Sequence, residues 1–320
     1  MPPFLFKNEI AFNIETDMKL SHRQAVMLMI ACTMMWSIAG VVTRHLEHAK
    51  SFEVTFWRSF FTLLSLAIIL PVIHGKALLS KFKQGGMYLW ISGVCWSIMF
   101  TAFMTALTMT SVANVLITLS LGPMLTALFA RVVIGHKLPA RTIIAIVVAG
   151  VGIAYMYAAQ INLSDMNQLT GMLVALGVPI AAAVNWTLVQ HSQAHGHDVD
   201  LVPAVMVGAL LSSLVTLPLS MPFQASGQDV ALLAMLGLVQ LAIPCALVVV
   251  CARYLKAPEV SLLALLEIIF GIALAWVGAN EKPGSPVLLG GGLVLGALVF
   301  NEWLGMRERA IKLQNNDLAL

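Results

Sequence analysis

Apolar stretches of about twenty residues recur along the chain and are separated by short polar joins. An α-helix needs about 20 apolar residues to cross the ~30 Å hydrocarbon layer of a bilayer. The pattern therefore predicts an all-α integral membrane protein with ten transmembrane helices, at 24–45, 53–73, 87–108, 111–134, 140–160, 169–190, 201–222, 230–252, 258–279 and 286–304.

The boundary between the third and fourth spans needs support, because the two are almost continuous in hydropathy. The Thr-rich segment TMTS at 108–111 interrupts them. With ten spans and both termini cytoplasmic, fourteen of the eighteen Lys and Arg residues fall on the inner side, and the outer side receives only Arg44, Lys50, Arg58 and Lys282. This bias is typical of cytoplasmic loops. We therefore expect a multi-pass protein of the cytoplasmic (inner) membrane with both termini inside.

Composition narrows the class of protein further. Of the 320 residues, 59% are hydrophobic and 10% are charged, whereas soluble domains carry about 25% charged residues. The net charge of +3 gives no indication of a nucleic-acid partner. The chain shows no nucleotide-binding motif and no cluster arranged like a hydrolytic active site. We therefore expect no enzyme, no direct use of ATP and no cofactor.

Cysteine and histidine give little indication of a metal site. The four cysteines lie within apolar spans and are interpreted as small buried residues, namely Cys32, Cys95, Cys245 and Cys251. The segment HSQAHGHDVD at 191–200 contains three histidines. Three imidazoles suggest zinc or nickel, but the segment is polar and broken by glycine. A solvated loop is the preferred interpretation, and no metal is expected.

The chain contains an internal repeat. Residues 110–139 and 256–284 share a small-residue start, a long apolar run and a polar break, and a shift of 145 residues aligns Val115 with Val260, Lys137 with Lys282, and His136 with Glu281. Two halves of five spans each have opposite orientations, because five is odd. Inverted repeats of this kind place a substrate site near the middle of the membrane, so the repeat predicts a carrier.

The repeat also divides the chain into segments. We expect a cytoplasmic segment at 1–23, a first repeat at 24–160, a linker at 161–168, a second repeat at 169–304 and a cytoplasmic tail at 305–320.

The segment SVANVLITLSLGPMLTALFARVVIGHKLP resembles the EamA-type transporters of the drug/metabolite transporter superfamily. The features that carry this resemblance are a small-residue opening, a proline inside the span and a glycine at its end, here 111–114, Pro123 and Gly135. The second copy, LLEIIFGIALAWVGANEKP, matches relatives that have an acid at mid-span and another at the break. Trp36 and Arg58 also match the family pattern. The resemblance implies a ten-helix exporter of small metabolites, such as amino acids.

Two departures from the family pattern leave the substrate open. His136 stands where glutamate is commoner, and Ile268 stands where relatives often have proline. Besides a metabolite exporter, a multidrug or lipophilic-cation exporter and a non-transporting membrane receptor or scaffold remain alternatives. The expected partners are a small-molecule substrate, the lipid bilayer and, in one interpretation, protons. The oligomeric state is open.

Glu267 is an acid within an otherwise apolar span. On a helical projection it shares a face with Ala264, Gly271, Ala275 and Gly278, whereas the opposite face carries the larger residues Leu262, Leu265, Ile269, Ile272 and Trp276. Acids inside membrane helices face the bundle interior, because exposure of a charge to lipid costs several kcal/mol. Three interpretations remain: a coupling or substrate residue that gains and loses a proton, a permanent partner of a cation, or a neutral acid bonded to a backbone carbonyl.

Five further residues are candidates for a substrate or ion site. Arg58 is placed inside a span and either snorkels to the outer interface or turns inward toward Glu267. Trp36 and Trp96 lie close to mid-span, where they either pack or line a cavity. Asn114 and Thr118 lie on one stripe of the fourth span and either hold helices together or face the cavity.

Small residues also indicate close helix packing between the fifth and tenth spans, or against another protomer. Gly292 and Gly296 have the close-packing spacing in the tenth span, and Ala145 and Ala149 have it in the fifth.

Overall fold

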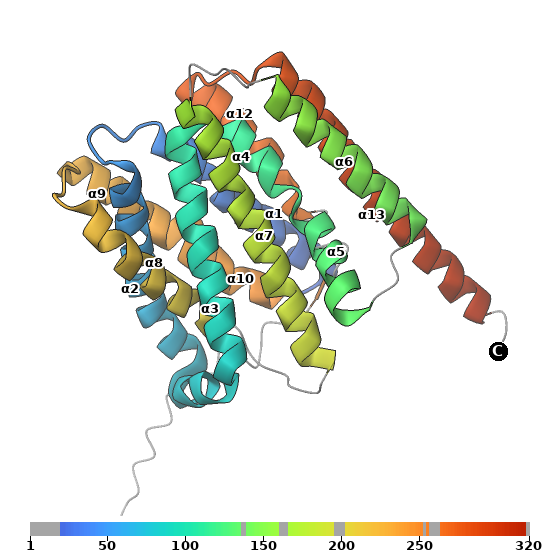
Figure 1. Ribbon diagram of the computed structural model, residues 1–320. Helices are drawn as coiled ribbons and strands as arrows, with labels where there is room; N and C mark the ends of the chain where they lie inside the picture. Colours follow the sequence, from blue (N-terminus) through green and yellow to red (C-terminus); the bar gives the residue numbers. More distant parts are fainter. Residues whose placement is uncertain are drawn as a thin grey trace, which may run out of the picture.

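In the computed structural model the chain forms a bundle of helices (Figure 1). The structure describes residues 20–135, 139–159, 166–194, 202–251, 254–255 and 263–317, and the regular secondary structure in these ranges is entirely helical. The described helices of the first half are α1 (His22–Thr43), α2 (Ser51–His74), η1 (Gly75–Ala77), α3 (Leu78–Met109), α4 (Val112–Leu119), α5 (Gly122–Ile134) and α6 (Ala140–Ala158).

The second half continues the same architecture. Its described helices are α7 (Met166–Ala194), α8 (Val202–Ser220), α9 (Gly227–Met235), the π-helical segment η2 (Leu236–Ala242), α10 (Ile243–Cys251), α12 (Leu266–Ala279) and α13 (Ser285–Asp317). Among the described residues nine helices are long and apolar enough to cross a membrane, counting α4–α5 and α9–α10 as one each, and α12 is a shorter apolar helix. The chain is therefore a multi-pass membrane protein.

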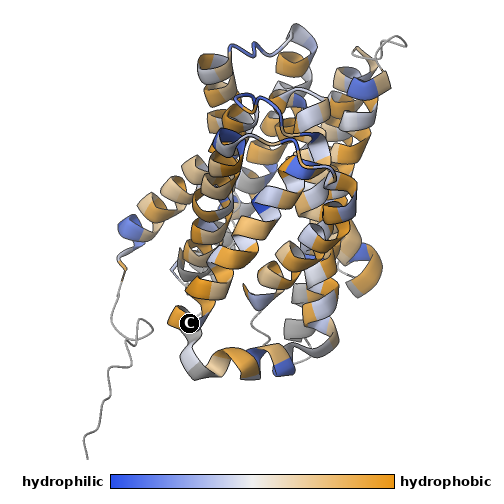
Figure 2. Cartoon of the chain, turned by 90° about the vertical axis from the view of Figure 1, so that its left-hand side faces the viewer, coloured by the Kyte–Doolittle hydropathy of each residue, from blue (hydrophilic) through white to orange (hydrophobic). Residues whose placement is uncertain are grey.

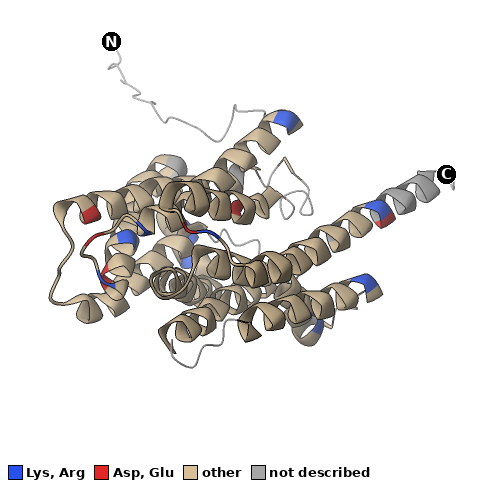
Figure 3. Ribbon diagram, turned by 90° about the horizontal axis from the view of Figure 1, so that it is seen from above, with Lys and Arg blue, Asp and Glu red and all other residues tan. Residues whose placement is uncertain are grey.

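The outer surface of the bundle suits a lipid environment. Large apolar side chains project outward, including Val277 (87% exposed) and Val132 (78%). Figure 2 shows that hydrophobic residues make up most of the helices, and Figure 3 shows the charged residues mainly toward the helix ends. An apolar surface of this extent would be unfavourable in water.

The break at TMTS is confirmed. α3 ends at Met109, Thr110 is extended, and Ser111 caps α4 by accepting a hydrogen bond from the backbone N–H of Asn114 at 3.2 Å. A side-chain oxygen at this position satisfies one of the free N–H groups of a helix start. Threonine and serine at 108–111 thus end one span and begin the next.

Two predicted helices are longer in the structure than in the sequence analysis. α3 begins at Leu78 instead of residue 87, because a polar segment adds helical turns before a bend at Gly86, where φ is 46°. α13 continues to Asp317 instead of ending at 304. Both extensions are polar, so the apolar pattern gave no signal for them, although residues such as Arg, Lys, Glu and Gln favour helices.

Two membrane helices are interrupted at matching positions. The fourth span breaks at Ser120–Leu121, between α4 and α5, and the ninth breaks at Leu265, immediately before α12. These positions correspond under the 145-residue shift that relates the two halves. Irregular backbone at membrane depth is tolerated where it is buried in protein or lines a water-filled cavity.

Helices of the two halves are interleaved. α3 packs against α7 and α8, α2 packs against α8, and α1 packs against α12. The pairs are matched between halves: α1 contacts α10 as α7 contacts α3, and α1 contacts α12 as α7 contacts α4 and α5. The core of the bundle is therefore built mainly from contacts between halves.

α6 and α13 lie side by side along much of their length (Figure 1). Their backbones approach at Gly152 and Gly290, and a Cβ atom added to Gly290 would lie 2.5 Å from the carbonyl oxygen of Gly152. Arg141 joins the same helices by donating to the carbonyl oxygen of Asn301 at 2.6 Å. The predicted pairing of the fifth and tenth spans is confirmed.

The two glycines that were expected to make this contact do not make it. Gly292 and Gly296 are exposed, and a Cβ atom on either would meet no atom within 4 Å. Gly290 of α13 instead faces Gly152 of α6, and Gly291 faces Ile117 of α4. LLGGGLVLG contains four glycines, and only Gly292 and Gly296 have the four-residue spacing, so the spacing rule selected a face of α13 that does not meet α6.

Gly290→Leu is expected to lower the free energy of unfolding by about 1–3 kcal/mol, because the new side chain forces α6 and α13 apart. Thermal unfolding of the purified protein in detergent, followed by tryptophan fluorescence, measures the loss. Gly292→Leu is the matched control on the open face of α13, and its effect should stay within about 0.5 kcal/mol. Equal losses in both variants would contradict the contact at Gly290.

Candidate functional site

Glu267 lies in the first turn of α12, directly after the break at Leu265. Its side chain is half-buried, and within the described residues its carboxyl forms no hydrogen bond or ion pair. Its backbone carbonyl accepts a hydrogen bond from the hydroxyl of Ser37 on α1 at 3.0 Å. The backbone of Glu267 is thus fixed against α1, while its carboxyl has no bonded partner among the described residues.

The predicted inward face of this span is largely correct. Gly271 and Ala275 are buried, and Gly271 allows Leu116 of α4 to approach closely. Ile269 (53%) and Trp276 (48%) are exposed. Leu265, on the opposite face of the projection, is buried, because it lies in the turn where the helix is broken and a continuous projection no longer applies.

Arg58 of α2 turns inward and is 1% exposed, so the snorkelling interpretation is wrong. Its guanidinium donates to the side-chain oxygen of Gln240 at 3.2 Å and to the carbonyl oxygen of Phe100 at 3.4 Å. The rings of Phe100 and Phe103 lie 5.5 and 5.6 Å from the guanidinium carbon. Its Nε atom is buried and has no hydrogen-bond partner.

Gln240 was not predicted from the sequence as part of the site. It belongs to the π-helical segment η2 and is 3% exposed. Its amide nitrogen donates to the carbonyl oxygen of Trp36 on α1 at 3.4 Å, and its oxygen accepts from Arg58 on α2. Gln240 therefore connects three helices, and π-helical turns occur frequently at functional sites.

Cys245 of α10 lies within electrostatic range of Arg58, Cys32 and Glu267. It is half-buried, as is Glu267. Arg58 and Glu267 form no direct ion pair in the described part of the chain. The structure therefore brings Arg58 and Glu267 to the same region, around Cys245, without a direct bond between them. We call the four residues Arg58, Gln240, Cys245 and Glu267 the central polar cluster.

Trp36 and Trp96 occupy different surroundings. Trp36 is half-buried and packs beside a buried group on α1 and α10 that includes Met29 and Cys251. Trp96 packs against aromatic rings, with centroid distances of 5.5 Å to Phe100 and 6.4 Å to Trp186. Trp96 thus packs against the ring of Phe100, and Phe100 in turn contacts Arg58.

Thr118 joins neighbouring helices, whereas Asn114 bonds to Thr110 just before its own helix. Asn114 is 1% exposed and donates to the hydroxyl of Thr110 at 3.0 Å. Thr118 is fully buried, donates to the carbonyl oxygen of Asn114 and lies 2.9 Å from the hydroxyl of Tyr157. Tyr157 in turn donates to the carbonyl oxygen of Met172 on α7. This chain joins α4, α6 and α7 and lies outside the central polar cluster.

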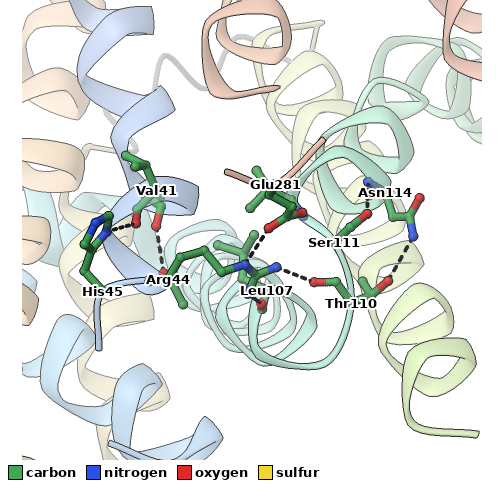
Figure 4. A network of polar contacts seen from close by, with 11 residues as sticks. Val41, Arg44, His45, Leu107, Thr110, Ser111, Asn114 and Glu281 are labelled. Atoms are coloured by element: carbon green, nitrogen blue, oxygen red, sulfur yellow. Dashed lines mark hydrogen bonds and ion pairs between the residues drawn. The ribbon is translucent and has the colours of Figure 1, made fainter. Parts of the chain in front are cut away.

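A second polar network lies at the end of the bundle where α1, α3 and α12 finish, which we call the Arg44 end (Figure 4). Arg44 forms an ion pair with Glu281 at 2.6 Å and donates to the carbonyl oxygens of Leu107 and Thr110 at 2.5 and 2.7 Å. Glu281 also accepts the backbone N–H of Val112 at 2.6 Å. Two side chains thereby tie together α1, α3, α4 and the segment after α12.

Two buried acids fix loops at the same end. Glu53 accepts the backbone N–H groups of Gln224 and Ala225 at 2.8–3.0 Å. Asp229 accepts those of residues 47, 48 and 49 at 2.9–3.1 Å. Charge-assisted hydrogen bonds of this kind are roughly twice as strong as neutral ones. At the Arg44 end, carboxylates therefore fix loops and helix ends by hydrogen bonds.

These networks were missed because their partners are distant along the chain. Arg44 and Glu281 are 237 residues apart, and Arg58 and Gln240 are 182 apart. A usable signal existed for Glu281, which the internal repeat places at a break, and for Gln240, an amide within an apolar span. Of the histidines at 191–197, His195 and His197 lie outside the described residues, and the described part contains no group of three potential metal ligands.

Comparison with known proteins agrees with this architecture. A solved structure described only as "Crystal structure of protein" matches with a TM-score of 0.57 and 18% identity, over 89% of this chain and 99% of that one. At this identity the likeness concerns the fold alone. The comparison with curated proteins returns no match.

The family comparison is more specific. The model of the EamA-like transporter family matches twice, at residues 23–158 and 169–302. The two matches span most of the chain and correspond to two repeats, each containing one of the interrupted helices. The chain belongs to the EamA-like transporter family.

Proposed function

We propose that this protein is a secondary transporter that exports small metabolites, such as amino acids or related compounds, across the cytoplasmic membrane. It works by alternating access around the central polar cluster. The observation that carries the proposal is Glu267: a half-buried carboxyl without a protein partner in the described residues, at the start of a half-helix within a membrane span. A carboxyl that merely stabilised the bundle would be paired.

The transporter consists of ten spans in two inverted repeats of five. The matched breaks at Ser120–Leu121 and Leu265 support this arrangement, as do the matched helix contacts of the two halves. In inverted-repeat transporters the site lies at the repeat interface and is formed by discontinuous helices. The Lys and Arg bias places both termini inside and the Arg44 end on the opposite, outer side.

Glu267 acts as the coupling residue in this mechanism. Its carboxyl takes up a proton in one state of the cycle and releases it in the other. The corresponding position in the first repeat is Gly122, so only the second repeat supplies a titrating group at this depth. The other two interpretations of Glu267 are less well supported, since no cation and no carbonyl oxygen pairs with it in the described structure.

Counterflow in proteoliposomes tests the proposal. Vesicles loaded with one unlabelled amino acid should accumulate the same labelled amino acid only when they contain the protein. A panel of amino acids and lipophilic cations distinguishes the metabolite exporter from a multidrug exporter, in which Glu267 would bind the substrate's positive charge. Absence of exchange with every compound would favour a receptor or scaffold and contradict the proposal.

A further inference from the structure

The guanidinium of Arg58 has unused hydrogen-bonding capacity in the interior of the bundle. An arginine side chain offers five N–H donors, and within the described part of the chain Arg58 forms two hydrogen bonds, at 3.2 and 3.4 Å. Both are longer than the 2.7–2.9 Å typical of charge-assisted bonds. Nε has no hydrogen-bond partner among the residues that the structure describes, although Arg58 is 1% exposed.

The charge of Arg58 is also unbalanced. Within the described residues the ion pairs join Arg44 to Glu281, His48 to Glu47 and Arg141 to Glu308, and none involves Arg58. Two phenyl rings contribute weaker cation–π attraction. A buried charge without a counter-ion is costly, so its retention here indicates that an anion from outside the protein binds at this point.

We infer that the transported substrate carries a carboxylate and that Arg58 binds it, an inference that rests on the proposed function. Phe100 and Phe103 approach the guanidinium, and the unpartnered Nε lies in the guanidinium plane beside Nη2. Nε and Nη2 together present two parallel N–H groups, the geometry that a planar carboxylate accepts in bidentate fashion.

The central polar cluster also limits the charge of the ligand. It contains one buried cation, Arg58, and one carboxyl, Glu267, both close to Cys245. A singly charged carboxylate balances Arg58, whereas a dianionic phosphate would leave excess negative charge beside Glu267. A substrate with an amino group in addition would place its positive charge toward Glu267. The geometry therefore favours an amino acid over a purely cationic compound.

Arg58 is shielded from water in this conformation. Gln240 of η2 and Phe100 of α3 cover it. The carboxylate therefore reaches Arg58 when η2 and α3 separate, and it displaces these two long hydrogen bonds. Gln240 is then a specificity-determining neighbour that occupies the guanidinium in the absence of substrate.

The test is a binding measurement on the purified full-length protein in detergent. The probes are the L-amino acids and the same compounds as amides, which lack only the carboxylate. We expect at least one amino acid to raise Tm, its amide to bind at least tenfold more weakly, and Arg58→Gln to lose the tenfold preference. Arg58→Lys should retain part of it, because lysine keeps the charge but not the bidentate geometry.

The variant Gln240→Glu tests the same site while keeping Arg58. It places an internal carboxylate within reach of the guanidinium, so the protein should fold with an unchanged or higher Tm and bind the same amino acid at least tenfold more weakly. Gln84→Glu is the matched control, since it makes the same chemical change at an exposed position of α3 outside the cluster, and it should change binding by less than threefold.

The outcomes separate this inference from the proposed function. Equal binding of acids and amides, or no stabilisation by any amino acid, overturns the assignment of Arg58. Arg58-dependent binding of an amino acid without any counterflow would uphold the site and overturn transport. Counterflow of lipophilic cations that is unaffected by Arg58→Gln would uphold transport and overturn the carboxylate site.

Discussion

Replacing Glu267 with glutamine is expected to abolish the pH dependence of transport and to leave the protein folded. Glutamine has nearly the same shape but cannot exchange a proton. The carboxyl forms no bond to the described part of the protein, and a neutral amide is less costly to bury than a carboxylate. We therefore expect a Tm equal to or above that of the parent protein.

The measurement is uptake into proteoliposomes over a range of external pH, with an internal pH-sensitive dye to follow protons. Glu53→Gln is the matched control, because it makes the same chemical change in an acid that accepts backbone N–H groups from two residues. It should lower the free energy of unfolding by about 1–3 kcal/mol and preserve the pH dependence. Proton-coupled uptake that persists in Glu267→Gln would remove Glu267 from the mechanism.

The second large effect is expected at the Arg44 end. Arg44→Gln removes an ion pair and leaves the carbonyl oxygens of Leu107 and Thr110 without their partner. The side chains of Arg44 and Glu281 are only 26% and 21% exposed. The conformation in which the Arg44 end is closed should therefore lose on the order of 2–3 kcal/mol of free energy relative to a conformation in which this end is open. This corresponds to a change of roughly 30–150-fold in the ratio of open to closed molecules.

Labelling of Cys245 reports this opening. Cys245 is half-buried in the central polar cluster, whereas Cys32, Cys95 and Cys251 are buried and can be replaced by alanine. A water-soluble maleimide added from the Arg44 side should react with Cys245 at least tenfold faster in Arg44→Gln.

Two controls accompany the labelling experiment. Arg141→Gln removes an arginine that also pairs with a glutamate and donates to a carbonyl oxygen, but between α6 and α13, and should leave the labelling rate unchanged. The double variant of Arg44 and Glu281 should be less impaired than the two single effects together. An unchanged rate in Arg44→Gln would show that this network does not hold the end closed.

The apolar pattern predicted the membrane spans and the break at TMTS, because the thickness of a bilayer imposes a length on each helix. It could not show the interruption at Leu265, where no proline or glycine marks the chain. Just after the interruption, the carbonyl oxygen of Glu267 accepts a hydrogen bond from Ser37, which lies 230 residues away, and hydropathy gives no indication of this contact. Hydropathy records where a segment lies in the membrane, but not whether its backbone continues as a helix.

The candidate site was predicted unevenly for similar reasons. Glu267 and Arg58 were found because a charge within an apolar span is conspicuous, and the structure brings both near Cys245. Asn114 and Thr118 have the same polar character as site residues, yet Asn114 bonds to Thr110 just before its own helix, and Thr118 contacts Tyr157 of α6. Periodicity places a residue on a face, but only the packing of the other helices decides what that face meets.

The interleaved contacts have a consequence for how the chain is assembled during synthesis. α1, α2, α3 and α6 find their main neighbours among α8, η2, α7, α12 and α13, which emerge from the ribosome later. The early helices can insert into the bilayer one by one, but they have few helices to pack against until the later helices are inserted. A polypeptide that ends after α6 is therefore expected to be a set of inserted helices that does not pack into a stable bundle without the second half.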